Sequence, residues 1–137
     1  MDGLDLTGNH VPLAERLNDK TDGWYDTLLP DHTIVTATRS VGCVEDRARS
    51  AWLELEESLP SFTAVIGPPC SKDVADVAGQ KWRGTSSGSR AVVISPGSTT
   101  PELKNEAEYP NVARAAGTDD QMAQAFTKLG DTLGWDR

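Results

Sequence analysis

Two loops of small and hydroxyl-bearing residues are the part of this sequence best suited to bind a ligand. The first, Pro69-Cys70-Ser71, follows one apolar run, and the second, Gly97-Ser98-Thr99-Thr100, follows another. Both loops combine hydroxyl groups with backbone N–H groups that no bulky side chain would mask, so they suit a polar or anionic group. Two plainer interpretations stay open. Ser71 could simply cap the helix predicted after it, and residues 98–100 could simply form a turn.

The two cysteines, Cys43 and Cys70, allow three interpretations. Cys70 lies at a predicted helix N-terminus, which would lower the pKa of a thiol and could make it the nucleophile of a hydrolase. No base is evident near it, since His10 lies in the N-terminal segment and His32 in a predicted strand. A disulfide is the second interpretation, because both cysteines are predicted near the starts of helices that follow adjacent parallel strands. Closing that loop would stabilise the fold by roughly 3–4 kcal/mol. Two unrelated buried thiols are the third.

The other polar groups predict no chemistry of their own. The GPPC run lacks the Gly-Lys-Ser/Thr element of a phosphate-binding loop. A set of aspartates fits a solvated acidic surface and not a metal site: Asp19, Asp22, Asp26 and Asp31. The tryptophans are spread along the chain and fit core or interface packing: Trp24, Trp52, Trp82 and Trp135. We therefore expect no metal and no cofactor.

A strand–helix–strand unit should position the two loops. The apolar runs Phe62–Ile66 and Ala91–Ile94 have the β-branched composition of strands, and an amphipathic segment from Ser71 to near Trp82 separates them. Parallel strands need such a helical crossover. Ligands of sheets built in this way bind at the carboxyl ends of the strands, where both loops fall.

The remaining elements can be predicted from periodicity and from start and stop signals. Residues 12–18 favour a short helix, 19–31 a loop, 32–38 a strand and 43–58 a helix. The GTSSGS run between Trp82 and Arg90 reads as a flexible surface insertion. Residues 101–103 favour a helical turn and 109–115 an extended segment. A capping box at Thr118 opens a last helix, with Met122, Phe126, Leu129 and Leu133 on one face and Gly134 at its end.

Bulk properties limit the partners. The 137 residues suit one domain, with residues 1–10 as an irregular start and no boundary inside 11–137. A formal net charge of -8 argues against nucleic acid or an anionic membrane surface as partner. No apolar run approaches the ~18 residues of a membrane span. The first ten residues contain no apolar signal-peptide core, so an extracellular location would depend on sorting information outside this chain.

Two motifs together resemble a known family. VIGPPCSKDVADVAG and VVISPGSTTPEL look like the receptor ligand-binding region of the type I periplasmic-binding-protein fold. Natriuretic peptide, metabotropic glutamate and GABA-B receptors carry such regions. Tyr109-Pro110 with Arg114, an aspartate at 119 or 120, and Gly134-Trp135 fit the same pattern, as does Leu28-Leu29-Pro30-Asp31 upstream. The resemblance covers about residues 12–137.

The resemblance implies a three-layer αβα, flavodoxin-like lobe with a parallel sheet, here incomplete. It would be lobe 1, residues 11–137, of a two-lobed domain that closes on a small amino-acid-like ligand. Cys43–Cys70 would be the disulfide of that lobe. Ser71 would contact the carboxylate end of the ligand, and Gly97, Ser98 and Thr99 would form the second contact loop. Tyr109 and Arg114 would have structural roles.

The same resemblance implies a non-enzymatic extracellular part of a membrane receptor, of the GABA-B-like class C G-protein-coupled type or the receptor guanylate cyclase type. Its partners would be the missing lobe 2 and a second receptor subunit. A soluble solute-binding protein of amino-acid transport is the alternative, and a hydrolase using Cys70 a third class. The chain departs from the family in three respects: the first strand is reduced to MDGLDLTG, lobe 2 is missing, and Pro69 replaces a glycine.

Overall fold

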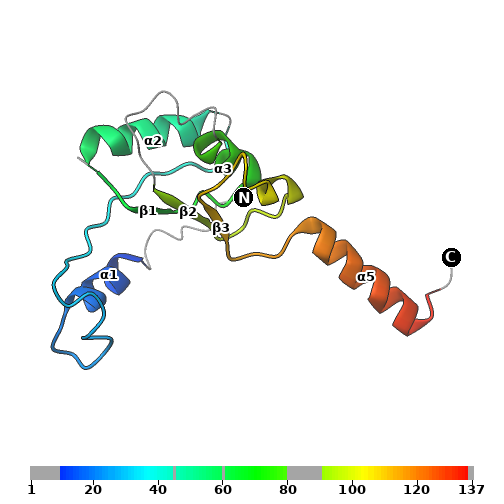
Figure 1. The fold of residues 1–137 in the computed structure, drawn as a ribbon, viewed down its shortest axis with the longest axis horizontal. Coiled ribbons are helices and arrows are strands. Elements are labelled where there is room, and N and C mark those ends of the chain that lie inside the picture. Colours follow the sequence, from blue (N-terminus) through cyan, green and yellow to red (C-terminus); the bar gives the residue numbers. More distant parts are fainter. Residues whose placement is uncertain (1–9, 45, 60, 80–90, 136–137) are drawn as a thin grey trace. The chain divides into compact units, whose positions relative to one another are not determined.

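The computed structural model describes residues 10–44, 46–59, 61–79 and 91–135 (Figure 1). The chain divides into two compact units, residues 1–40 and 41–137. The predicted GTSSGS insertion, Trp82 and the N-terminal residues 1–9 lie outside the described residues.

The first unit has one helix and a long irregular segment. Helix α1 (His10–Asn18) covers the predicted 12–18 helix and begins two residues earlier. The side-chain amide of Asn18 holds the segment in place, because it donates to the Ile34 carbonyl (2.8 Å) and accepts from the Ile34 N–H (2.7 Å). Lys20 donates to the carbonyls of Leu17 and Leu28. Bonds from side chains to the backbone therefore organise this unit.

The strand predicted at residues 32–38 is wrong. These residues are irregular in the structure, and Val35 is 77% exposed. A strand preference reflects how well a side chain packs on a neighbouring strand and a covered face. Residues 32–38 have the β-branched composition of a strand, but they pair with no other strand among the described residues. Their side chains therefore have no neighbouring strand on which to pack.

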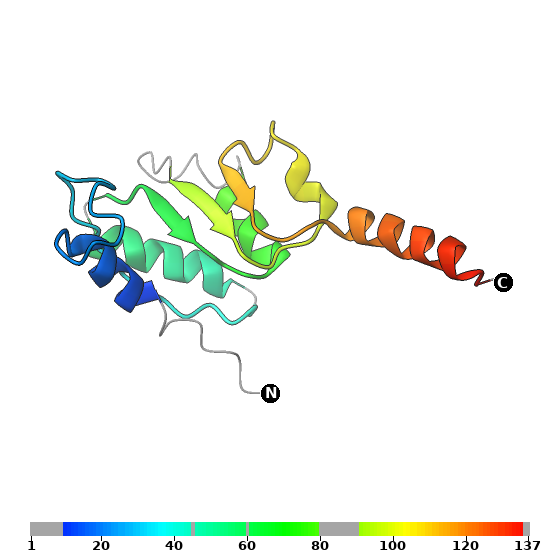
Figure 2. The same cartoon turned by 90° about the horizontal axis from the view of Figure 1, so that it is seen from below.

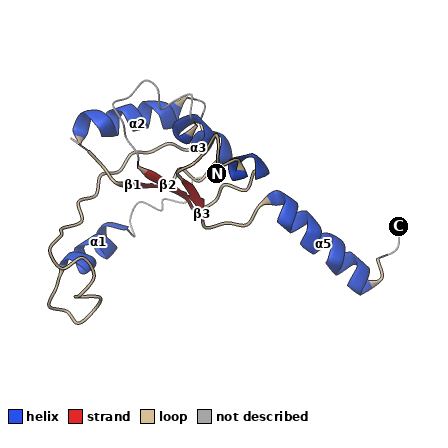
Figure 3. Cartoon of the chain, viewed as in Figure 1, coloured by secondary structure: helices blue, strands red, loops and turns tan. Residues whose placement is uncertain are grey.

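The second unit is built on a parallel sheet of three strands, β1 (Ala64–Ile66), β2 (Val92–Ser95) and β3 (Val112–Arg114), in that spatial order (Figures 1 and 3). Ile66 pairs with Ile94, and Ser95 with Arg114. Strands therefore occur within both predicted apolar runs, over shorter or shifted ranges, and a third strand lies within the segment at 109–115 that was predicted to be extended.

Two helices and the sheet enclose the core. Helices α2 (Arg47–Ser58) and α3 (Ser71–Ala78) pack on each other, and α3 packs on β2. Val93 and Val74 are fully buried between them, and the ring of Trp52 meets Phe62 edge-on at 5.2 Å. Residues neighbouring Val93 in β2 point the other way: Val92 and Ile94 are 41% and 37% exposed.

The predicted start of the second helix needs correction. The helix was expected from Cys43, and α2 begins at Arg47. Cys43 and Asp46 have φ of 54° and 61°, in the left-handed region that interrupts a right-handed helix. At Cys43, Val44 and Asp46 the expected first turn is therefore replaced by a loop, and this loop carries Cys43.

The last part of the unit consists of a 3-10 turn, η2 (Pro101–Lys104), and helix α5 (Asp119–Leu133), both as predicted. The capping box at Thr118 is present, and Gly134 ends the helix with φ 66°. No residue of α5 is buried, and its apolar side chains Met122, Phe126, Leu129 and Leu133 are all exposed. Figure 2 shows α5 extending beyond the sheet.

The α/β class and the parallel sheet are confirmed. The described part of the second unit consists of three strands, one helical layer formed by α2 and α3, the turn η2 and helix α5. The second outer layer of a three-layer arrangement is not seen among the described residues of this unit.

Candidate functional site

The two hydroxyl-rich loops meet at one edge of the sheet. One follows β1 and leads into α3, and the other follows β2 and leads into η2. Because β1 and β2 are parallel, both loops leave from the carboxyl edge. Three separate contacts join the two loop regions, made by Ser95 at the end of β2, by Gly97 and by Ser71.

Ser95 makes the first contact, beneath the surface. Its side chain is fully buried. Its hydroxyl donates to the Pro68 carbonyl (2.8 Å) and accepts from the Ser98 N–H (3.1 Å). The end of β2 is thereby bonded both to the first loop and to its own turn. No role was predicted for Ser95, although it stands in the SPGSTT run.

Gly97 makes the second contact by close approach. A Cβ atom placed there would lie 3.1 Å from the Pro69 carbonyl oxygen and 3.5 Å from the Pro69 Cβ. A contact of 3.1 Å is tighter than packed carbon and oxygen atoms normally accept, so a larger residue would push the two loops apart. Gly97 is required here by space and not by a positive φ.

Ser71 makes the third contact. Its Oγ accepts from the N–H groups of Thr99 (3.1 Å) and Thr100 (3.3 Å). The N-cap of α3 is Cys70, and Ser71 is the first helical residue, so the interpretation of Ser71 as a cap is wrong. Its hydroxyl holds the second loop instead of closing its own helix.

The predicted binding residues differ in their access to solvent. Ser71 and Thr99 are partly exposed and Gly97 is exposed, whereas Ser98 is completely buried. The Oγ of Ser98 has no hydrogen-bond partner within the described residues. The structure therefore brings the four residues together, with Ser98 inside the loop and the other three at its surface.

The second loop is also supported from the side of β3 and α5. Arg114 donates from Nη1 to the Thr100 carbonyl (2.7 Å), and the Thr99 carbonyl accepts from the Asp119 N–H (2.9 Å). Lys104 pairs with Asp120 at 2.6 Å, and this hydrogen bond lowers the pKa of Asp120 to about 2. Arg114 thus has a structural contact, and so does Tyr109, which is buried in the core.

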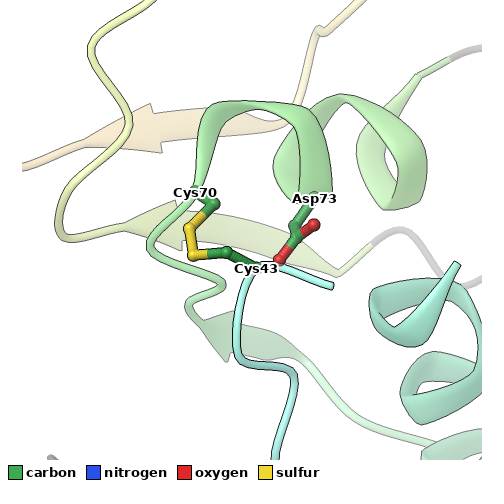
Figure 4. Close-up of side chains that lie close together, drawn as sticks. All are labelled: Cys43, Cys70 and Asp73. Atoms are coloured by element: carbon green, nitrogen blue, oxygen red, sulfur yellow. A yellow bond between two sulfur atoms is a disulfide. The ribbon is translucent and has the colours of Figure 1, made fainter. Parts of the chain in front are cut away.

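The cysteines lie beside the first loop. Cys43 and Cys70 are joined in a disulfide, with their Cα atoms 5.7 Å apart, and no cysteine is free (Figure 4). Asp73, one turn into α3, lies next to them and is only 3% exposed. Burial raises the pKa of Asp73 and the nearby Asp76 adds to the rise, while Lys72 and the Cys43 N–H oppose it. No role was predicted for Asp73 from the sequence. The sequence feature that could have drawn attention to Asp73 is the spacing Cys-x-x-Asp at a predicted helix start.

These observations place the chain in the class of α/β domains whose loops converge at the carboxyl edge of a parallel sheet, where such domains bind ligands. The chain belongs to the family described as the receptor family ligand binding region, whose model matches residues 24–137. Members of this family are extracellular ligand-binding domains of membrane receptors and are generally not catalytic. No individual curated protein matches the chain.

One further finding concerns the membrane. Among residues 10–44, 46–59, 61–79 and 91–135, no helix is both long enough and apolar enough to span a bilayer.

Proposed function

We propose that this chain supplies one lobe of a two-lobed receptor domain and binds a small amino-acid-like ligand at the edge formed by Ser71, Gly97, Ser98 and Thr99. The observation that carries the proposal is the pair of hydrogen bonds from the Thr99 and Thr100 N–H groups to the Ser71 hydroxyl. These bonds fix the helix start and the hydroxyl-rich loop as one surface.

The chemistry of that surface suits a carboxylate. The Ser71 oxygen accepts two N–H groups, and the hydrogen of the same hydroxyl can be donated to a ligand oxygen. The N-terminus of α3, with its positive dipole end, lies at the same place. Thr99 is partly exposed and offers a second hydroxyl within the loop. Ser98, which is buried, would maintain the conformation of the loop through the hydrogen bond from its N–H to the Ser95 hydroxyl.

The proposed receptor is of the GABA-B-like class C G-protein-coupled type or the receptor guanylate cyclase type. The other half of the ligand contacts would come from a second lobe, and a second receptor subunit would be the dimer partner. In this assignment the protein acts at the outer surface of a membrane as a sensor.

The substitution Ser71→Ala in the full-length receptor tests the proposal. Glutamate, glycine and γ-aminobutyrate serve as probes in calorimetric titrations. Loss of a hydrogen bond to a charged group typically costs about 1.5–3 kcal/mol, so the affinity for the bound probe should fall roughly ten- to a hundred-fold.

Ser50→Ala is the matched control. The Ser50 hydroxyl bonds only within the α2 region, to the Asp46 carbonyl at 3.1 Å. Its removal should leave affinity unchanged. An affinity that Ser71→Ala does not alter, or the absence of binding by all three probes, contradicts the proposal.

A further inference from the structure

A buried carboxylate lies against the disulfide without a complete set of partners. Asp73 is 3% exposed, and its Oδ2 atom has no hydrogen-bond partner among the described residues. The Asp73 carboxylate accepts one hydrogen bond, from the backbone N–H of Cys43. A buried carboxylate oxygen without a partner is costly, and its presence calls for a reason.

The donor atoms around this carboxylate form a compact group. The sulfur atoms of Cys43 and Cys70 and one carboxylate oxygen of Asp73 all lie within 4.8 Å of one another (Figure 4). In a tetrahedral zinc site, with Zn–S near 2.3 Å and Zn–O near 2.1 Å, neighbouring donor atoms are about 3.4–3.8 Å apart. Once the S–S bond is open, side-chain rotations would have to move the two sulfurs apart to that spacing, and the Cα–Cα distance of 5.7 Å keeps both within reach of one metal ion.

From this geometry we propose that reduction of the Cys43–Cys70 disulfide creates a zinc site, with the two thiolates and the Asp73 carboxylate as protein ligands. A fourth position would be left for water. Two thiolates with one carboxylate suit Zn²⁺ better than Mg²⁺ or Ca²⁺, which prefer oxygen ligands. This proposal is independent of the ligand site at Ser71.

The chemical steps balance with a dithiol as the reductant. The dithiol gives two electrons to the S–S bond and is itself oxidised to a disulfide, and its two protons pass to the Cys43 and Cys70 sulfurs. On zinc binding both thiols release their protons to solvent. The metal would then neutralise most of the negative charge of the two thiolates and the Asp73 carboxylate. The positive end of the α3 dipole would stabilise the remaining negative charge.

The local backbone is suited to hold such a site. Cys70 is the N-cap of α3 and Asp73 its third residue, so the helix fixes their relative positions. Cys43 lies on the loop before α2, with φ 54°, and is exposed to solvent. The helix would hold two of the ligands, Cys70 and Asp73, in fixed positions. The exposed loop at Cys43 would let the reductant and the metal reach the site.

Cobalt and zinc titrations of the full chain test the proposal. Protein reduced with a phosphine and freed of metal should bind about one Co²⁺ per chain, with a thiolate-to-cobalt absorption band that Zn²⁺ abolishes. The oxidised protein should show no such band. Asp73→Asn, which keeps both cysteines, should weaken zinc binding about ten-fold or more. Asp76→Asn, on the same helix, is the control and should leave zinc binding unchanged.

Alkylation gives a readout that does not depend on the variants. In the reduced wild-type chain, Zn²⁺ should protect Cys43 and Cys70 from iodoacetamide, and peptide mapping would measure this. If Asp73→Asn does not refold, this protection decides the question. The proposal is overturned by the absence of a thiolate band in the reduced wild type, by unprotected cysteines, or by a folded Asp73→Asn variant that binds zinc as tightly as the wild type.

Discussion

Residues 32–38 and residues 91–95 have similar compositions and opposite outcomes. Both are rich in β-branched side chains, yet only the second forms a strand. Val93 is fully buried between β1, β3 and α3, whereas Val35 is 77% exposed. The difference shows that a strand forms where neighbours and a covering helix are available. Among the described residues, polar side-chain contacts hold the first unit, and an apolar core holds the second.

The largest expected contrast comes from one tryptophan in each unit. Trp52 is 5% exposed in the core of the second unit, so Trp52→Ala should destabilise it by about 3–5 kcal/mol. Trp24 meets Arg16 in a cation–π contact at 4.5 Å, so Trp24→Ala should cost only about 0.5–1 kcal/mol. Urea unfolding followed by circular dichroism measures both. Equal effects of the two substitutions would contradict the division into a packed and a polar unit.

The second contrast concerns the disulfide, which belongs to the second unit only. Its cysteines are 27 positions apart in the sequence, so its removal by Cys43→Ser with Cys70→Ser should cost about 3–4 kcal/mol on the chain-entropy model. Chemical denaturation of the second unit measures the loss. Non-reducing peptide mapping of protein from an oxidising compartment is the companion measurement, and recovery of both cysteines in alkylated form would show that the bond is not made there.

A smaller loss of stability is expected when the hydrogen bonds between Asn18 and Ile34 in the first unit are removed. Asn18→Ala removes both hydrogen bonds to Ile34, which should cost about 1–2 kcal/mol locally. Amide hydrogen exchange at Ile34 should accelerate, while exchange at Val93 in β2 stays slow. Asn18→Asp is the useful comparison, because it keeps the acceptor for the Ile34 N–H and loses the donor. Unchanged exchange at Ile34 would show that the amide does not hold the segment.

The smallest effect concerns Lys104 and Asp120, an exposed pair. The folded pKa of Asp120, about 2, lies below its usual value of 3.8. A lowered pKa stabilises the folded form above the unfolded pKa, and this contribution is lost as pH falls from near 4 towards 2. In Lys104→Met the pKa of Asp120 should rise towards 3.8, as measured by NMR titration.

Local signals predicted the second unit well. The runs at 62–66 and 91–94, the helix from Ser71 and the capping box at Thr118 all contain their own start or stop residues, and each was found in place. The start of α2 was missed because the left-handed conformation of Asp46 depends on the loop that carries Cys43.

The predicted binding residues were brought together, but the bonds that do so could not be read from the sequence. Ser71 stands where a cap is common, and only the tertiary structure shows that its hydroxyl accepts from the Thr99 and Thr100 N–H groups. Ser95 and Asp73 were missed for the same reason. Their partners, Pro68 and Cys43, are about thirty residues away along the chain.

Because the strands of the sheet are parallel, each strand can pair only after the next one has been synthesised. The topology therefore sets the order of strand pairing during translation. β1 pairs only with residues from position 92 onward, and β2 in turn pairs with residues from 112. At roughly 5–20 residues per second, Ile66 leaves the ribosome roughly 1–6 s before its partner strand. Cys70, by contrast, follows Cys43 after 27 residues and precedes β2. In an oxidising compartment the covalent link can therefore form before the sheet exists, and it would tether the helix start while β1 waits for its neighbour.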